Sequence, residues 1–186
     1  MGIFDFFKSN KKEPEIDKVE VLTLDKPDFG KINFEKLEDY YDWTLKFGKR
    51  EINLDLNFET ESINQSELNQ IQEFVNRIPE FDIQNRDYIK ADFEQDVSMT
   101  SDYLKFYLDE LDDNELANII DLKNRKKSRS ILLMEQLNLI RVGIYPLASY
   151  FGIFDYSIDI DGEPCNQLLV TQINKDGTLN HITWES

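Results

Sequence analysis

The chain has few of the residues on which catalytic and metal sites are commonly built. Its 186 residues include one cysteine, Cys165, and one histidine, His181. A zinc site made of several histidines or several thiolates is therefore excluded within this chain, as is an internal disulfide. Neither a glycine-rich phosphate loop nor the nucleophile elbow of serine hydrolases occurs in the sequence. We therefore expect no enzymatic activity, no catalytic residue, no cofactor and no metal ion.

Long apolar runs are also absent. No stretch approaches the roughly 18 apolar residues of a transmembrane helix. The apolar segment Ile3–Phe7 is interrupted by Asp5 and lacks the preceding basic residues of a secretory signal. This segment predicts an N-terminal turn or tail, with a short interfacial anchor as the alternative. Together with the single cysteine, these absences predict a cytoplasmic protein without a membrane partner.

Positive charge is scarce. The chain has 21 basic residues against 37 acidic ones, which gives a formal net charge of −16. Because phosphate binding requires positive charge, a nucleic-acid partner is not expected. Hydrophobic residues make up 40% of the chain and aromatic residues 12%, which is enough for a packed core. We expect a charged tail or tether over residues 1–18 and a single domain over residues 19–186.

The clearest local pattern is the alternation of apolar and polar residues over 51–58. A period of two is typical of a strand with one buried face. With residues 43–47 before it and a turn at Gly48, the segment predicts a β-hairpin. The even-numbered residues of 51–58 are expected to be buried, while Asn53 and Asp55 face water or a second layer. Further strands are predicted over 19–24, around 32–34, and over 140–145, 154–160, 167–173 and 178–184.

Between the two sets of strands the period becomes helical. Asn64 and Glu67 resemble a capping box and predict a helix over 64–78 that ends at Pro79. Further helices are predicted near 86–97 and near 101–111, the latter capped by Thr100 or Ser101. Two more are predicted, one after the box-like pair Asp112 and Glu115 and one near 131–137. Strands followed by helices and strands predict an α+β fold. We expect a mostly antiparallel sheet of N- and C-terminal strands, with the central helices packed on one face.

Cys165 and His181 are the remaining pair that could form a nucleophile–base dyad. If Ile173 pairs with Thr178 across the last hairpin turn, His181 lies opposite Val170. Cys165 is then about 17 Å further along the strand, at roughly 3.3 Å per residue. A dyad requires a contact of roughly 3 Å, so this pair is not expected to react together.

Two other charged features have simpler interpretations than a binding site. The turns 159–162 and 174–177 have glycine at the fourth position, where a β-turn requires it, and not at the sixth position of an EF-hand loop. The basic stretch 123–129 is too short to define a nucleic-acid surface. Because it directly follows the acidic helices, we expect internal charge pairing or a solvated loop.

The acidic charge is concentrated in residues 80–121, which hold 13 acidic and three basic residues, a net formal charge of −10. Such a field accelerates encounter with a basic partner. The candidate partner-binding residues are Asp102, Tyr103, Asp109, Glu110, Asp112, Asp113 and Glu115. Tyr88 and Tyr103 would supply aromatic anchors, whereas Phe106 and Tyr107 are expected to pack in the core. The alternative is a solvated face that keeps the protein soluble.

Several segments resemble one known family. They are Phe29–Gly30, the hairpin 43–58, Leu139–Pro146, Asp155–Ile158, Lys175–Gly177 and Trp184–Ser186. Over roughly residues 25–186 the chain resembles the small bacterial proteins of domain-of-unknown-function family 2004. These segments are core and turn patterns, so the resemblance transfers no catalytic residue. It implies a bacterial cytosolic α+β domain, and similar small acidic proteins often serve as immunity proteins in toxin systems.

The leading hypothesis is a non-enzymatic bacterial interaction protein of the immunity-inhibitor type. It would dock a basic protein through the acidic helical surface and cover a basic active site. The alternative is a small-ligand-binding or structural adaptor domain. The sequence leaves the oligomeric state and the identity of the partner open.

Overall fold

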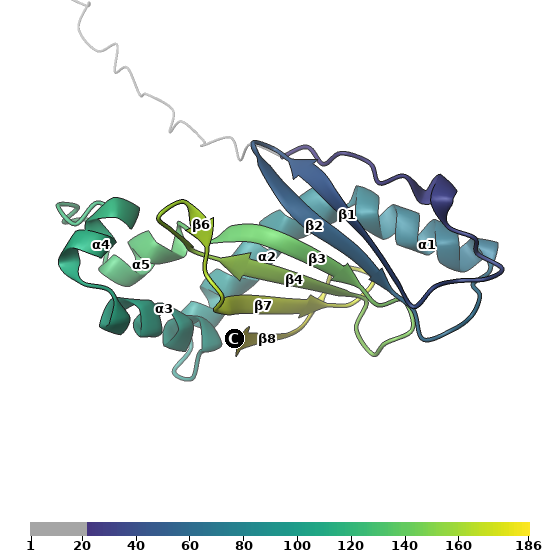
Figure 1. The fold of residues 1–186 in the computed structure, drawn as a ribbon. Helices are drawn as coiled ribbons and strands as arrows, with labels where there is room; N and C mark the ends of the chain where they lie inside the picture. Colours follow the sequence, from purple (N-terminus) through teal and green to yellow (C-terminus); the bar gives the residue numbers. More distant parts are fainter. Residues whose placement is uncertain (1–21) are drawn as a thin grey trace, which may run out of the picture.

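The computed structural model describes residues 22–186 of the chain (Figure 1). Their elements in chain order are η1 (Phe29–Lys31), β1 (Tyr40–Phe47), β2 (Arg50–Asn57), α1 (Gln65–Asn76), α2 (Ile78–Phe93), α3 (Met99–Glu110), α4 (Asp113–Ile119), α5 (Arg129–Met134), β3 (Asn138–Ile144), β4 (Gly152–Ser157), β5 (Asp159–Ile160), β6 (Glu163–Pro164), β7 (Leu168–Ile173) and β8 (Leu179–Glu185). The predicted tail over 1–18, including Ile3–Phe7, lies outside the described residues, as do residues 19–21 of the strand predicted over 19–24. Of the described part, Leu24 forms an isolated bridge with Phe47.

Six strands form one sheet in the order β1-β2-β3-β4-β7-β8. Neighbouring strands are antiparallel except β2 and β3, which are parallel. A parallel pair requires a long crossover, and this one carries the five α-helices of the described residues. The strands β5 and β6 form a small separate sheet, which divides the strand predicted over 154–160. The predicted α+β class with a mostly antiparallel sheet is confirmed.

The core lies between the sheet and α1 and α2. Figure 1 shows these two helices behind the sheet, while α3, α4 and α5 gather at one end. Ile52, Leu54 and Leu56 are at most 1% exposed, as the alternation predicts. The ring of Phe74 lies 4.7 Å from that of Phe81, and tilted aromatic pairs of this kind add to the stabilisation from burial. The opposite face of the sheet, turned toward the viewer in Figure 1, is covered by none of the labelled helices and is called the open face below.

The longest helix, α2, differs from its prediction at both ends. It spans Ile78–Phe93, whereas the sequence predicts a helix near 86–97. Helix α1 ends at Asn76, before the predicted end at 78, and Pro79 lies in the first turn of α2, where a missing N–H breaks no helical hydrogen bond. Asp82 and Asn85 are buried on α2 and interrupt the apolar period that would have revealed it. Within the described residues, no helix is both long enough and apolar enough to span a bilayer.

Two smaller predictions are also wrong. Residues 29–34 contain η1 and a turn instead of a strand, because the Asp28 carboxylate caps η1. Helix α3 is capped by Ser98, whose hydroxyl accepts a hydrogen bond from the Ser101 N–H, and not by Thr100 or Ser101. Both errors concern short polar side chains that can cap a helix from several positions.

Two turn glycines provide a matched test of the packing between the β7–β8 turn and α2. Gly162 and Gly177 have φ of +86° and +93°. A Cβ on Gly177 would lie 2.5 Å from the Phe81 ring, whereas a Cβ on Gly162 would meet nothing within 4 Å. We expect Gly162→Ala to cost about 1–2 kcal/mol from backbone strain alone. Gly177→Ala should cost at least about 1 kcal/mol more, because Phe81 must also move. Urea unfolding measures both, and equal losses would contradict the packing.

Candidate functional site

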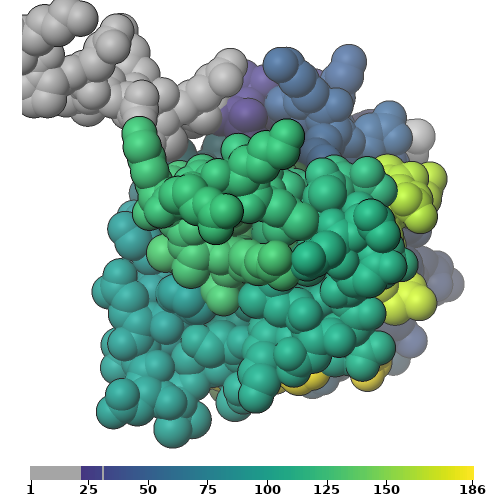
Figure 2. Space-filling model, turned by 90° about the vertical axis from the view of Figure 1, so that its left-hand side faces the viewer, coloured from purple at the N-terminus to yellow at the C-terminus, as the bar shows by residue number. Residues whose placement is uncertain are grey.

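The acidic surface predicted from the sequence lies at one end of the molecule, on α3 and α4. Figure 2 looks onto this end, where the teal and green residues of α3, α4 and α5 form the surface. The structure brings six of the predicted residues together there, all exposed: Asp102, Asp109, Glu110, Asp112, Asp113 and Glu115. These six carboxylates are called the acidic surface below.

Tyr103, the seventh predicted residue, is not on this surface. Its side chain is fully buried, and its ring packs edge-on against Tyr107 at 5.2 Å and against Trp184 of β8 at 6.3 Å. Its hydroxyl donates a hydrogen bond to the Gln167 carbonyl at 3.3 Å, and burial raises its pKa. The predicted role of Tyr103 as a partner anchor is therefore corrected: the side chain fastens α3 to the sheet.

The other aromatic side chains of this region also pack inward. Tyr88 is half-buried, and its hydroxyl donates a hydrogen bond to the Gly177 carbonyl at 3.3 Å. Phe106 and Tyr107 pack against the core, as expected, with the Phe106 ring 5.4 Å from that of Trp184. The acidic surface is therefore a charged surface without the aromatic anchors that the sequence suggested.

Three members of the acidic surface have structural roles. Asp112 and Glu115 form a reciprocal capping box at the start of α4, as predicted. Asp113 forms an ion pair with Arg129 at 2.8 Å. Lys127 pairs with Glu135 at 2.5 Å, so part of the basic stretch is neutralised by internal pairing, as expected.

The other three members, Asp102, Asp109 and Glu110, form no ion pair with any residue that the structure describes. Lys105 lies between Asp102 and Asp109 at helical spacing, and it forms no ion pair within the described residues either. This part of α3 is therefore net negative and open to water. This part of α3 therefore attracts cationic groups.

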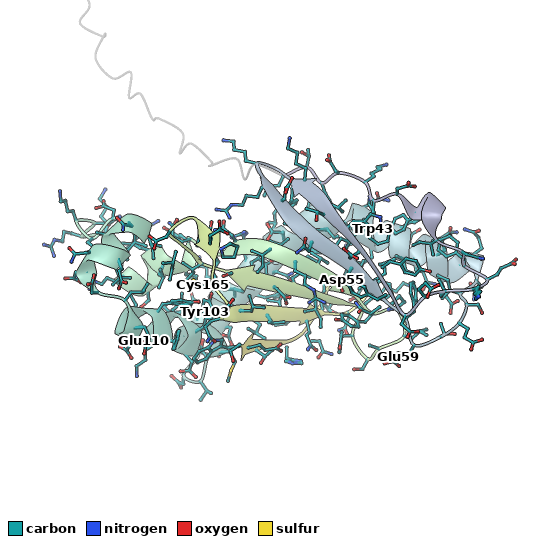
Figure 3. All side chains as sticks on the ribbon, viewed as in Figure 1. Trp43, Asp55, Glu59, Tyr103, Glu110 and Cys165 are labelled. Atoms are coloured by element: carbon teal, nitrogen blue, oxygen red, sulfur yellow. The ribbon has the colours of Figure 1, made fainter. Side chains whose placement is uncertain are left out.

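A second candidate site, which the sequence analysis missed, lies on the open face of the sheet. The strand registers place Asp55 of β2, Arg141 of β3 and Asp155 of β4 on this face, and Figure 3 labels Asp55. Arg141 donates from Nε to Asp55 Oδ1 at 2.6 Å and from Nη1 to Asp155 Oδ2 at 2.8 Å. Its Nη2 donates to Asp55 Oδ2 at 2.9 Å and to the Tyr145 hydroxyl at 3.0 Å. These four residues are called the Arg141 bridge.

The Arg141 bridge depends on Gly143, which lies opposite Asp55 in the β2–β3 register. A Cβ on Gly143 would lie 2.7 Å from Nη2 of Arg141 and 2.9 Å from the Tyr145 ring. The missing side chain lets the guanidinium lie along β3 and reach Asp55. A register shift between Leu139 and Arg141 also breaks the regular pairing with β4 at this point.

The Arg141 bridge is largely shielded from water, which strengthens the attraction between its charges. The side chains of Asp55 and Asp155 are 1% and 6% exposed, against 31% for Arg141. The expectation that Asp55 faces water or a second layer is therefore wrong. Burial raises the pKa of Asp155, hydrogen bonds and the charge of Arg141 lower it, and the charges of Glu185 and Asp55 raise it. Because Arg141 uses four of its five N–H donors inside the bridge, it has little capacity left for an anion.

Two cavities accompany these surfaces. One of about 360 Å³ adjoins the Arg141 bridge and is lined by Thr44, Asn53 and Leu168 among others. The other, of about 740 Å³, lies between α2 and α5. Its apolar lining residues are Ile89, Phe93, Ile131, Met134 and Leu137. The second volume is within the range of small-molecule sites.

The structure keeps Cys165 and His181 apart, although the register differs from the predicted one. His181 pairs with Gln172 and not with Val170, which increases the separation from Cys165 along the strand. His181 is exposed, and its Nδ1 lies 2.8 Å from Asn180 Oδ1. Among the described residues, no group of three or more histidine, cysteine, aspartate or glutamate side chains could hold a metal ion.

Comparison with known proteins adds no relative. No protein-family model, no curated protein and no solved structure matches the chain. The resemblance to family 2004 stays a prediction, and the function must be argued from the side chains.

The Arg141 bridge generates a pH-dependent prediction. Arg141→Met leaves Asp55 and Asp155 buried without a cation, and we expect a loss of about 3–5 kcal/mol at neutral pH. Since burial already raises the pKa of Asp155, the folded variant binds this proton at a higher pH than the unfolded chain does. Stability then falls as pH rises through that window, so lowering the pH to about 4.5 should recover part of the loss.

Urea unfolding of Arg141→Met at pH values of about 7.5 and 4.5 measures this effect. The triple variant Arg141→Met/Asp55→Asn/Asp155→Asn is the control, because it removes both orphaned carboxylates and should flatten the difference between the two pH values. A loss in Arg141→Met that is the same at both pH values would show that the bridge is not electrostatic.

Proposed function

We propose that this protein is a non-enzymatic interaction protein that docks a basic protein partner through the acidic surface. The observation that carries the proposal is the set of exposed, unpaired carboxylates on α3: Asp102, Asp109 and Glu110. A charge that no internal cation neutralises keeps its field in solution and can attract a partner.

A rigid base supports the docking role. Tyr103 and Phe106 hold α3 against Trp184, and the capping box of Asp112 and Glu115 fixes the start of α4. Backbone that is already ordered loses less conformational entropy when a partner binds. The carboxylates are therefore presented in a fixed arrangement.

The mechanism is occlusion of a basic site. The field of residues 80–121, with a net formal charge of −10, steers a cationic surface toward the acidic surface and disfavours acidic competitors. A partner with a basic active site would be covered by this contact, as an immunity-type inhibitor would cover its toxin. This mode requires no catalytic group on the present chain.

The cavity between α2 and α5 favours a second candidate function, the binding of a small apolar ligand. Its lining combines five apolar residues, Ile89, Phe93, Ile131, Met134 and Leu137, with six charged ones, and its volume suits a small ligand. A ligand that uses this cavity should raise the melting temperature of the wild type and not that of Ile131→Trp, which fills the space.

Charge reversal tests the leading proposal. Asp102→Lys/Asp109→Lys/Glu110→Lys changes residues that neither cap a helix nor form an ion pair in the described structure. We expect association with the partner to slow by about tenfold or more at low salt. Raising the salt from about 0.01 M to about 1 M shortens the screening length from about 30 Å to about 3 Å, so the wild type should slow toward the variant. Stopped-flow kinetics with the partner captured on the wild-type chain measures this.

The matched control is Asp25→Lys/Glu35→Lys/Glu73→Lys. It makes the same change in net charge at exposed residues of α1 and of the segment before β1, which lie away from α3 and α4 in Figure 1. The control should associate nearly as fast as the wild type. Equal slowing of both variants would show that net charge, and not the acidic surface, governs encounter.

A further inference from the structure

The open face carries a cluster of tyrosines at the end of the sheet away from α3 and α4. This cluster, called the tyrosine patch below, consists of Tyr40, Tyr145, Leu147 and Tyr150. Glu59, whose charge acts on Tyr150, and Glu110 of the acidic surface lie at opposite ends of the molecule in Figure 3. The tyrosine patch and the acidic surface are therefore separate features.

The strand registers set the spacing of the tyrosines. Tyr40 pairs with Asn57, and Asn57 and Tyr145 each directly follow the last parallel pair, Leu56 with Ile144. Tyr40 and Tyr145 thus stand on the open face on either side of Asn57, two strand spacings or roughly 10 Å apart in the backbone. The ring of Tyr150 lies 5.5 Å from that of Tyr145, in an edge arrangement.

The tyrosine patch is more exposed than aromatic and aliphatic side chains usually are. Tyr40 is 54% exposed, and Leu147, in the loop that joins Tyr145 to Tyr150, is 49% exposed. Tyr145 and Tyr150 are half-buried. Solvent-accessible tyrosines are typical of the energetically important centre of a protein interface, so the patch has the composition of a contact surface.

Two exposed carboxylates lie near the tyrosine patch. Asp42 and Glu59 form no ion pair with any residue that the structure describes. Glu185 pairs with Leu168 at the α3 end of the sheet and acts on Tyr150 only through its charge. Asp42 also lies directly opposite Asp55, and two like charges in such a cross-strand pair repel. Arg141 is the nearby cation, and it is already bonded to Asp55 and Asp155.

Charges of both signs act on the tyrosines of the patch. Burial is the largest cause of the raised pKa of Tyr40; the charges of Asp55 and Asp42 raise it further, and the charge of Arg141 lowers it. Burial is also the largest cause for Tyr150, where Tyr145, Glu59 and Glu185 raise the pKa and Arg141 lowers it. The acidic groups outnumber Arg141, so the net formal charge around the rings is negative and favours a cation.

We propose that the tyrosine patch binds an arginine or lysine side chain of a basic partner protein, with the cation over the tyrosine rings and the carboxylates around it. A guanidinium within about 6 Å of a ring centroid is attracted by the negative face of the ring. An anionic ligand does not fit, because Arg141 has used its donors. A second copy of the chain does not fit either, since its matching face carries the same negative charge. The inference rests on the proposed function only in taking the partner to be basic.

A pair of blocked peptides tests the inference on the full-length chain. The probe is acetyl-Gly-Arg-Gly-amide, and its matched control replaces arginine by citrulline, which has nearly the same shape and no charge. NMR of the tyrosine ring signals reports binding. We expect saturable shifts of Tyr40, Tyr145 and Tyr150 with the arginine peptide and at least about fivefold weaker binding of the citrulline peptide. Equal binding of the two peptides, or shifts confined to Tyr103 and Tyr107, would overturn the inference.

Substitutions separate the contribution of the rings from that of their hydroxyls. Tyr40→Leu/Tyr150→Leu should lose at least about fivefold in affinity for the arginine peptide, whereas Tyr40→Phe/Tyr150→Phe should keep most of it, because phenylalanine retains the ring face. Equal affinities of the Leu and Phe variants would overturn the role of the rings. Ring shifts that depend on protein concentration without peptide would assign the patch to a second copy instead.

The charge-reversal variant of α3 keeps this test distinct from that of the proposed function. Asp102→Lys/Asp109→Lys/Glu110→Lys leaves the tyrosine patch intact and should bind the arginine peptide as the wild type does. If this variant associates with the partner at the wild-type rate while the patch still binds the peptide, the proposed docking through α3 fails and the present inference stands. Loss of peptide binding in the α3 variant would overturn the inference.

Discussion

The parallel pairing of β2 with β3 is the junction on which the rest of the structure depends. It joins the N-terminal hairpin to the C-terminal strands across a crossover that carries five helices, so its contacts must offset a large loss of chain entropy. Leu54 and Val142, both fully buried, close the junction on the helical face. On the open face, the guanidinium of Arg141 spans β2, β3 and β4 by bonding Asp55 and Asp155. A one-residue slip would turn these charges into the core, so the bridge also specifies the register.

A second buried polar contact fixes the helical layer to the same strands. The Tyr156 hydroxyl of β4 donates to Asp82 Oδ1 of α2 at 3.0 Å, and Arg86 donates to Asp82 Oδ2 at 3.2 Å. Arg86 also donates to the Leu137 carbonyl at 3.0 Å, just before β3. Burial and the charge of Asp82 raise the pKa of Tyr156 well above its usual value, so its hydroxyl stays protonated and remains a donor. The sheet is thus held by one ionic network on each face, and both networks meet at β4.

Features encoded by neighbouring residues could be predicted from the sequence, and features encoded by register could not. The hairpin and the capping boxes at Asn64 and Asp112 depend on a few adjacent residues, and the structure confirms them. The Arg141 bridge depends on which residues of β2 and β4 lie beside Arg141 in the sheet. These strand pairings join residues far apart in the chain, so no local sequence pattern predicts them. The available signal was one charged residue inside an otherwise apolar strand. The predicted role of Tyr103 was wrong for a related reason. The acidic residues around Tyr103 suggested a surface position, whereas its spacing from Tyr107 fits the buried side of α3.

Outside these networks, the molecule has two surfaces that differ in the range over which they act: the carboxylates of α3 and the tyrosine patch. The carboxylates of α3 are exposed and act over distance, so in the proposed complex their contribution would belong to the rate of encounter and would weaken with salt. The rings of Tyr40 and Tyr145 act only at contact, so in the inferred complex their contribution would belong to the rate of dissociation. Between the two ends, Arg141 neutralises half of the formal charge of Asp55 and Asp155, and both carboxylates are buried and already bonded to it, so the middle of the open face offers a cationic partner little direct contact. A basic partner that used both ends would therefore be steered by one end and retained by the other.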